Sequence, residues 1–257
     1  MNLFCDIDGT FWQHSDTDFT QYAKNLEAVK RFRAAGGIFG FATGRGVPSM
    51  RRNFPDYIDN ADYLIVDNGS FAVDVKAEKL IGEIVFEPNE LKRIVNIATR
   101  IYPDNRLAIS YHGYLQEYRY PIAPIGKIRL WLLDESLIDP LMNEINLEIG
   151  EEKLKMHHER HAVKSSLSWV GSEYHAFMNV MPYESGKEEA ITRLIKTERL
   201  EGQTVVLGDD LNDIAMIKRF DGYAMRDSHP KLLKEVSEDH IVNNPEELIN
   251  KLLINMQ

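Results

Sequence analysis

Short apolar runs alternate with a helical pattern at the start of this chain, and that alternation limits the folds it can adopt. Leu3-Phe4-Cys5 predicts a short buried strand. A helical pattern follows, and it stops at Gly36-Gly37, which is a good helix terminator. Ile38–Ala42 then predicts a second strand. The apolar positions of the helix are Tyr22, Leu26, Val29 and Phe32. A strand, a helix and a strand in this order predict a parallel sheet with a right-handed crossover, and such sheets bind ligands beyond the carboxyl ends of their strands.

Two aspartates follow the first strand in the segment Asp6-Ile7-Asp8-Gly9-Thr10. Alternate side chains of an extended segment project to the same side, so the carboxylates of Asp6 and Asp8 can converge. Two carboxylates at close range favour a cation between them, and hard oxygen ligands suggest Mg²⁺. The same segment also fits an ordinary Asp-Gly turn, because Gly9 permits unusual backbone angles and Thr10 can hydrogen-bond within a turn. The pair by itself leaves both interpretations open.

Further polar segments follow the other apolar runs. Thr43-Gly44-Arg45 continues directly from the second strand, and Gly208-Asp209-Asp210-Leu211-Asn212-Asp213 follows a predicted strand at Thr204–Leu207. Lys187 begins another helical pattern, for which Ser185 is the expected N-cap. A cation in the first turn of a helix is mildly unfavourable for the helix dipole, so the position of Lys187 hints at a functional role.

These four segments in this order resemble the motifs of the haloacid dehalogenase superfamily. The turn Val66-Asp67-Asn68-Gly69-Ser70 and Met216 are similar to features of its Cof-type branch, in which a large cap is inserted after the second motif. Asp210 stands where the family frequently has glycine. The resemblance implies an α/β fold: a Rossmann-like parallel sheet core with helices on both faces, plus a smaller inserted α+β cap domain.

The interval between the Asn-Gly turn and Lys187, more than 100 residues, is long enough for a separate small domain. It contains a predicted helix with apolar positions from Leu91 to Ile101 and a predicted strand at Leu107–Tyr111. A predicted hairpin has its turn at Gly171-Ser172. We expect residues 1–84 and 181–257 to form the catalytic core, and residues 85–180 to form a cap that determines substrate specificity.

The resemblance also implies roles for individual residues. Asp6 would attack phosphorus and form an aspartyl-phosphate, while Asp8 would protonate the leaving group and later activate water. A dehalogenase needs no acid at the second position, so the presence of Asp8 favours phosphate chemistry. The other expected roles are phosphate binding by Ile7, Thr43, Gly44, Lys187 and Asn212, metal binding by Asp6, Asp8 (through its backbone carbonyl) and Asp209, and support by Asp213 and Asp210.

The predicted function is therefore a Mg²⁺-dependent phosphatase that hydrolyses small phosphorylated metabolites, with sugar phosphates as the expected substrates. One alternative is a phosphomutase, which would return the phosphoryl group to a sugar. Another is a non-catalytic protein that binds phosphorylated metabolites on the same scaffold. The loss of Asp6 or Asp8 would indicate that second alternative, and both residues are present.

Composition excludes several other classes of protein. A net charge of −10 argues against broad nucleic-acid binding. No apolar run approaches the ~20 residues that span a bilayer, and no secretory signal is visible, so we expect a cytoplasmic protein without membrane contact. Cys5 is the only cysteine, which excludes an intrachain disulfide and a cysteine-based zinc cluster. No obligate protein partner is evident.

Overall fold

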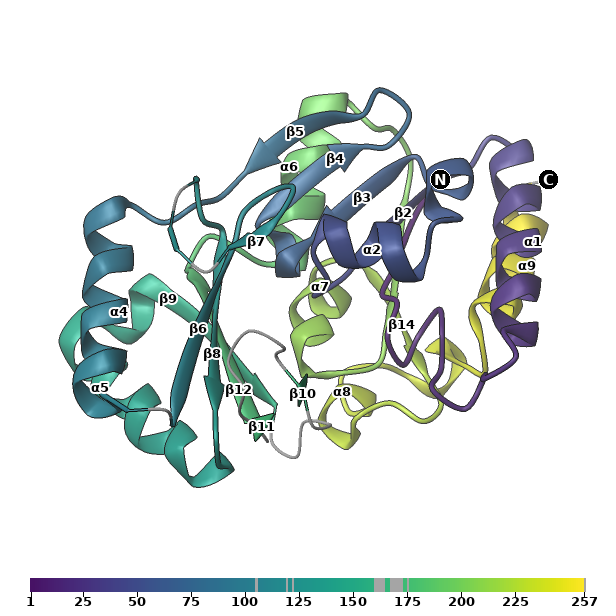
Figure 1. Cartoon of the computed structure of the whole chain (residues 1–257). Helices are drawn as coiled ribbons and strands as arrows, with labels where there is room; N and C mark the ends of the chain where they lie inside the picture. Colours follow the sequence, from purple (N-terminus) through teal and green to yellow (C-terminus); the bar gives the residue numbers. More distant parts are fainter. Residues whose placement is uncertain are drawn as a thin grey trace. The chain divides into compact units, whose positions relative to one another are not determined.

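The computed structural model describes residues 1–104, 106–118, 120–121, 123–159, 165–166, 173–174 and 176–256. The chain divides into two compact units. The first comprises Met1–Arg45, Ser49–Glu83 and Gly186–Gln257, and the second comprises Gly46–Pro48 and Ile84–Ser185. Each unit contains a large β-sheet of its own (Figure 1).

The sheet of the first unit has eight strands within the described residues. In sheet order they are β15 (Ile241–Val242), β14 (Asp221–Met225), β13 (Thr204–Gly208), β1 (Asn2–Cys5), β2 (Ile38–Ala42), β3 (Tyr63–Val66), β4 (Phe71–Asp74) and β5 (Lys79–Glu83). Neighbouring strands from β15 to β3 pair in parallel. The predicted strands near Leu3, Ile38 and Thr204 therefore form the centre of this sheet.

Helices cover both faces of this sheet because its strands carry apolar residues on both sides (Figure 1). Phe4 and Val206 pack in one buried cluster with residues of α6 (Lys187–Glu198) and α7 (Ile214–Arg219). The helices α1 (Thr20–Ala34) and α9 (Pro245–Asn255) lie side by side and contribute further buried apolar residues. The shorter helices of this part of the chain are α2 (Val47–Asn53), α3 (Tyr57–Asn60) and α8 (Pro230–Leu233).

One edge of the sheet departs from the parallel arrangement. The strands β3, β4 and β5 pair antiparallel. The turn between β3 and β4 has positive φ at Asp67, Asn68 and Gly69, so the chain reverses within a few residues. A parallel pair needs a crossover of a dozen or more residues, so this short turn forces antiparallel pairing.

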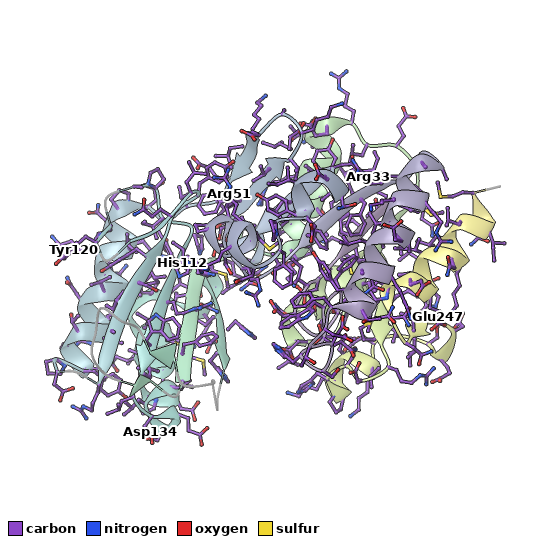
Figure 2. All side chains as sticks on the ribbon, turned by 45° about the vertical axis from the view of Figure 1, so that its right-hand side comes forward. Arg33, Arg51, His112, Tyr120, Asp134 and Glu247 are labelled. Atoms are coloured by element: carbon purple, nitrogen blue, oxygen red, sulfur yellow. The ribbon has the colours of Figure 1, made fainter. Side chains whose placement is uncertain are left out.

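A side-chain ion pair connects α1 to the neighbouring strands. The guanidinium of Arg33, which is labelled in Figure 2, donates from Nη2 to Asp62 Oδ1 at 2.7 Å and from Nε to Asp62 Oδ2 at 3.1 Å. Asp62 Oδ2 also accepts the backbone N–H of Phe39 at 2.9 Å. Asp62 therefore ties the end of α1 to the start of β2.

The second unit is an α+β structure. Its five-stranded antiparallel sheet has the order β7 (Glu117–Tyr118), β6 (Leu107–His112), β8 (Lys127–Leu132), β12 (Ala176–Pro182) and β9 (Leu154–Glu159). The helices α4 (Pro88–Ile101) and α5 (Ile138–Ile149) pack on one face of this sheet through a shared apolar cluster (Figure 1). The short strands β10 (Ser165–Ser166) and β11 (Glu173–Tyr174) pair antiparallel. The predicted hairpin turn at Gly171-Ser172 lies outside the described residues.

The predicted α/β class with an additional α+β domain is confirmed by these two sheets and their helices. Among the described residues, none of the helices combines the length and the hydropathy that a bilayer-spanning segment requires.

Candidate active site

The carboxyl ends of three adjacent strands bring the predicted site residues together. In the sheet order β13-β1-β2, Asp209 follows β13, Asp6 follows β1 and Thr43 follows β2. Parallel strands place their carboxyl ends at one edge of a sheet, which is the usual ligand-binding edge of such folds. Asp6 and Thr43 are both buried at this edge.

Lys187 connects two of the carboxylates at this edge. Its Nζ donates to Asp6 Oδ1 at 2.7 Å and to Asp213 Oδ1 at 2.6 Å, and the side chain of Lys187 is only 1% exposed. The predicted N-cap role of Ser185 is wrong, because Gly186 is the N-cap of α6 and Lys187 is its first helical residue. Gly186 has φ 159° and ψ 145°, an extended conformation from which the chain enters the helix with Lys187 directed into the site.

The electrostatics of this cluster are dominated by negative charge. Burial and the neighbouring carboxylates of Asp213 and Asp209 raise the pKa of Asp6 well above its usual range, despite the contact with Lys187. Burial, followed by the negative charge of Asp213, raises the pKa of Asp209 to about 7. Burial alone would lower the pKa of Lys187, but Asp213 and Asp6 outweigh it and raise that pKa. A single lysine therefore does not neutralise the site.

Asp209 is held by the loop that follows β1. Thr10 Oγ1 donates to Asp209 Oδ1 at 2.5 Å. Gly9 has φ +80°, and a Cβ atom at this position would lie 2.1 Å from Asp209 Oδ2. The Gly9-Thr10 turn predicted from the sequence is therefore present, and its glycine is required both by its backbone angle and by the proximity of Asp209.

Asp213 and Asp210 organise the loop after β13. Asp213 Oδ2 accepts the backbone N–H groups of Asp209 at 3.0 Å and Asp210 at 3.2 Å. The side chain of Asp210 in turn accepts the backbone N–H of Asp213, which completes a capping box. Since its other oxygen binds Lys187, Asp213 is engaged by protein groups on both oxygens.

Asp8 is directed toward a different partner from Asp6. The guanidinium of Arg45 donates from Nη2 to Asp8 Oδ1 at 2.5 Å and from Nε to Oδ2 at 2.7 Å. Arg45 also donates to Ser49 Oγ at 3.1 Å, and its Cζ lies 5.0 Å from the centre of the Phe54 ring. The Asp8 side chain is 36% exposed, so this bidentate pair lies at a solvent-accessible part of the site.

The predicted phosphate-binding residues occupy the same edge. Thr43 Oγ1 accepts the backbone N–H of Arg45 at 3.1 Å, and Asn212 Nδ2 donates to Asn68 Oδ1 at 3.2 Å. Ile7 is 1% exposed, so only its main chain is suited to contact a polar ligand.

The sequence predicts no role in the chemistry of the site for three of its residues: Thr10, Arg45 and Asn68. Each lies beside a motif residue that was predicted, and each contact joins positions far apart in the sequence. Their positions in the sequence could have indicated a role, since Thr10 lies in the turn after the first strand, Arg45 in Thr43-Gly44-Arg45 and Asn68 in the Asn-Gly turn.

The donor set fits a hard divalent cation. Within the part of the chain that the structure describes, carboxylate oxygens of Asp6, Asp209 and Asp213 lie within 4.8 Å of one another, close enough to bind one metal ion together. The raised pKa values of Asp6 and Asp209 show that a cation would relieve a charge excess. The side chain of Asp8 is paired with Arg45 instead. The expected binding of a metal by the backbone carbonyl of Asp8 stays a prediction.

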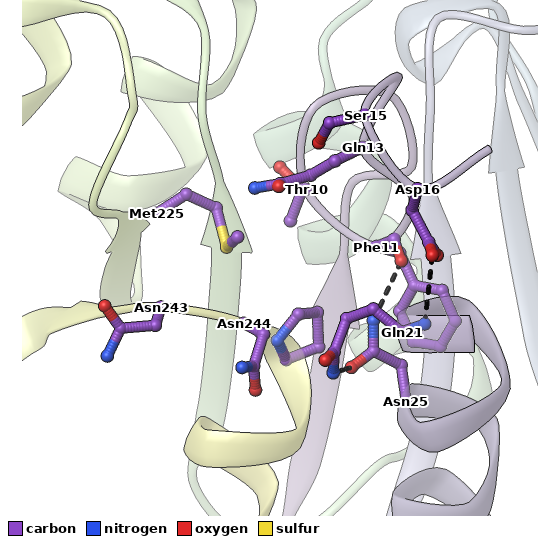
Figure 3. A pocket seen from close by; sticks show the side chains of 11 residues that line it. Thr10, Phe11, Gln13, Ser15, Asp16, Gln21, Asn25, Met225, Asn243 and Asn244 are labelled. Atoms are coloured by element: carbon purple, nitrogen blue, oxygen red, sulfur yellow. Dashed lines mark hydrogen bonds between the residues drawn. The ribbon is translucent and has the colours of Figure 1, made fainter. Parts of the chain in front are cut away.

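A separate polar pocket of about 330 Å³ lies beside this loop in the same unit (Figure 3). Its lining residues are Thr10, Phe11, Gln13, Ser15, Asp16, Gln21, Asn25, Met225, Asn243, Asn244 and Pro245. Asn25 donates to the carbonyl of Phe11 at 2.9 Å, and Asp16 accepts the backbone N–H of Gln21 at 3.1 Å. These bonds fix the loop that carries Thr10, while the Lys187 cluster is not part of the pocket lining.

Comparisons with known proteins agree with this arrangement. The model of the family described as "haloacid dehalogenase-like hydrolase" matches residues 3–247. A protein of Mycoplasma pneumoniae named "Putative phosphatase" is 26% identical over 240 residues, which cover 84% of this chain and 81% of that protein.

Solved structures share the fold across nearly the whole chain. A haloacid dehalogenase-like hydrolase from Bacteroides thetaiotaomicron has a TM-score of 0.74 at 17% identity, covering 98% of each chain. A HAD subclass IIB sugar phosphatase has a TM-score of 0.71 at 17% identity, covering 100% of this chain and 99% of that one. The predicted superfamily, with its Cof-type cap arrangement, is confirmed: the chain belongs to the haloacid dehalogenase-like hydrolases.

Proposed function

We propose that this hydrolase is a Mg²⁺-dependent phosphatase of small phosphorylated metabolites, with sugar phosphates as its preferred substrates. The observation that carries the proposal is the buried Lys187, which binds Asp6 and Asp213 beside Asp209. A nucleophilic carboxylate, a buried ammonium group and carboxylates that could hold a divalent cation are components that phosphoryl transfer requires. The sugar phosphatase among the structural neighbours supports the substrate class.

Asp6 is the proposed nucleophile. Lys187 binds its Oδ1 at 2.7 Å, which orients the carboxylate and leaves Oδ2 to attack phosphorus. The attack forms an aspartyl-phosphate and expels an alkoxide, so one difficult displacement becomes two easier ones. The ammonium of Lys187 also faces the transferring phosphoryl group as a point charge, together with donors from Thr43, Gly44 and Asn212.

Asp8 is the proposed general acid and base. The protonated form of Asp8 gives its proton to the departing alkoxide. The resulting carboxylate then takes a proton from the water that hydrolyses the aspartyl-phosphate, which restores the acid. Both of its oxygens are bound by Arg45, so Arg45 sets the orientation of Asp8 until a substrate enters. We infer that Asp8 exchanges part of this ion pair for the leaving-group oxygen during turnover.

Mg²⁺ would be held by Asp6, Asp209 and the backbone carbonyl of Asp8, with Asp213 and Asp210 supporting the loop. The ion, when bound, supplies positive charge for the phosphoryl oxygens. The second unit, which we equate with a cap at about residues 85–180, would determine which leaving group is accepted.

The test is release of inorganic phosphate from a panel of phosphorylated metabolites, with Mg²⁺ and with EDTA. We expect Mg²⁺-dependent release, fastest with one or more sugar phosphates. Inactivity of the intact chain on the whole panel would contradict the proposal and favour a binding protein. Conversion of a sugar phosphate into an isomer, with little phosphate released, would instead identify a phosphomutase.

A further inference from the structure

The turn between β3 and β4 contacts three segments of the proposed phosphate site. Asp67 and Asn68 have φ values of 50° and 55°, and Gly69 has φ 95°. Aspartate and asparagine adopt a left-handed backbone more readily than other residues with a Cβ atom, and here the two adopt it in succession. The contacts around the turn support this conformation.

The first contact is with the Thr43-Gly44-Arg45 loop. The backbone N–H of Asn68 donates to the carbonyl of Thr43 at 3.0 Å, and that of Asp67 donates to the carbonyl of Arg45 at 2.8 Å. A Cβ atom on Gly44 would lie 2.9 Å from Asn68 Oδ1, so the absence of a side chain at Gly44 makes room for the Asn68 amide.

The second contact is with Asn212. Asn212 Nδ2 donates to Asn68 Oδ1 at 3.2 Å, while Asn212 Oδ1 is buried and has no hydrogen-bond partner among the described residues. An asparagine amide presents a donor on one side and an acceptor on the other. Because Asn68 supplies an acceptor, it selects the orientation in which Nδ2 lies on this side, and one N–H of that nitrogen stays available for an anion.

The third contact is with the segment that leads to Lys187. A Cβ atom on Gly69 would lie 2.1 Å from the carbonyl oxygen of Gly186, so the two glycine backbones pack directly against each other. Gly186 is the N-cap of α6, and the residue after it is Lys187. The turn therefore supports the start of the helix that carries the site lysine.

We propose that Asn68 is a positioning residue of the phosphate site, which fixes the donor orientation of Asn212 through its side chain and aligns the Thr43-Gly44 and Gly186-Lys187 segments through its left-handed turn. The inference rests on the proposed phosphatase function, since it concerns the phosphate-binding residues of that same site. Asn68 acts through Asn212 and the two backbone segments, and it takes no part in bond formation.

The test is a double-mutant cycle on the full chain with Asn68→Gly and Asn212→Ala. Glycine keeps the positive φ of the turn and removes only the side-chain amide. We measure kcat and KM with the best substrate of the panel, and the inhibition constant of orthovanadate as a phosphoryl mimic. One lost hydrogen bond corresponds to a change of about three- to tenfold, so each single variant should weaken kcat/KM and vanadate inhibition by roughly this factor.

If Asn68 acts through Asn212, the double variant should be no worse than Asn212→Ala alone, because the interaction that Asn68 supports is already absent. Multiplicative losses in the double variant would overturn the inference. Wild-type vanadate inhibition in Asn68→Gly would overturn it as well.

Matched variants separate positioning from folding. Glu78 has φ 50° in the β4–β5 turn and is exposed, so Glu78→Gly repeats the backbone change away from the site and should leave kcat/KM unchanged. Asn68→Ala adds backbone strain to the loss of the amide, and we expect lower thermal stability and lower activity than in Asn68→Gly. Equal activity in these two Asn68 variants would overturn the proposed contribution of the turn. An inactive wild-type chain would instead contradict the proposed function, which distinguishes the two failures.

Discussion

Replacing Asp6 by asparagine should abolish turnover and also stabilise the metal-free protein. An amide does not attack phosphorus, so we expect kcat/KM to fall at least about 10³-fold, equivalent to about 4 kcal/mol of transition-state stabilisation. The free energy of unfolding should increase, because the raised pKa of Asp6 means that its charged form is costly in the folded protein. Neutral asparagine does not carry that cost.

The contacts of Asp6 explain the stability gain. Lys187 is the cation that binds Asp6 and Asp213, and the carboxylate of Asp209 adds further negative charge. Asparagine at position 6 can still accept from Lys187 through its Oδ1, and its amide group replaces the oxygen that adds to the charge excess. We therefore expect the free energy of unfolding to increase on the order of 1 kcal/mol, the usual scale of a single substitution.

Asp213→Asn is the matched control, since the same chemical change should have the opposite effect there. One oxygen of Asp213 accepts from Lys187 and the other accepts two backbone N–H groups. In Asp213→Asn an NH₂ group replaces one of these two oxygens and faces hydrogen-bond donors, so we expect the free energy of unfolding to fall by about 1–3 kcal/mol.

Urea denaturation in EDTA at neutral pH measures both stability changes, and phosphate release with Mg²⁺ measures activity. A stability loss in Asp6→Asn as large as in Asp213→Asn would refute the charge-excess reasoning. Retention of most of the phosphatase activity in Asp6→Asn would refute the assignment of the nucleophile.

Three further predictions follow from the same geometry. The raised pKa of Asp209 should make the EDTA-treated protein lose stability as pH rises from about 4 to 7, because Asp209 is ionised in the unfolded chain over this range but still largely protonated in the folded protein. Mg²⁺ should therefore raise Tm more at pH 8 than at pH 5. An equal rise in Tm at both pH values would contradict a carboxylate cation site. Arg45→Gln removes the ion pair that orients Asp8, so kcat should fall about tenfold for an alkyl phosphate. The loss should be smaller for p-nitrophenyl phosphate, whose leaving group needs little protonation. Equal losses on both substrates would argue against a role of Arg45 in orienting Asp8. Gly69→Ala should unfold or inactivate the protein, because its Cβ atom would meet the Gly186 carbonyl, while Gly82→Ala, which has no atom within 4 Å of the added Cβ, should retain normal Tm and activity.

Local sequence patterns were sufficient for much of the core. The strand at Ile38–Ala42 has the predicted bounds, and Thr204–Gly208 extends the predicted strand by one residue. These short apolar runs are buried on both faces, so their composition alone marks them as central parallel strands. The motif residues could be placed as well, because each directly follows such a strand or begins a helix.

Contacts between distant residues could not be predicted in the same way. The pattern placed Lys187 in the first turn of its helix, but Ser185 was the wrong N-cap because the conformation of Gly186 depends on its packing against Gly69. The antiparallel edge also escaped prediction, since nothing in the apolar pattern of the strands specifies their direction.

The sequence by itself determined which chemical groups are present and that they follow the carboxyl ends of strands, because the order of elements along the chain and the alternation of side chains are read from local patterns. Only the tertiary structure decided their partners: Lys187 with Asp6 and Asp213, Arg45 with Asp8, and Asn68 with Asn212. Each of these bonds depends on where two segments that are distant in the sequence meet in space. That distance is fixed by the packing of the whole unit, which no local pattern encodes.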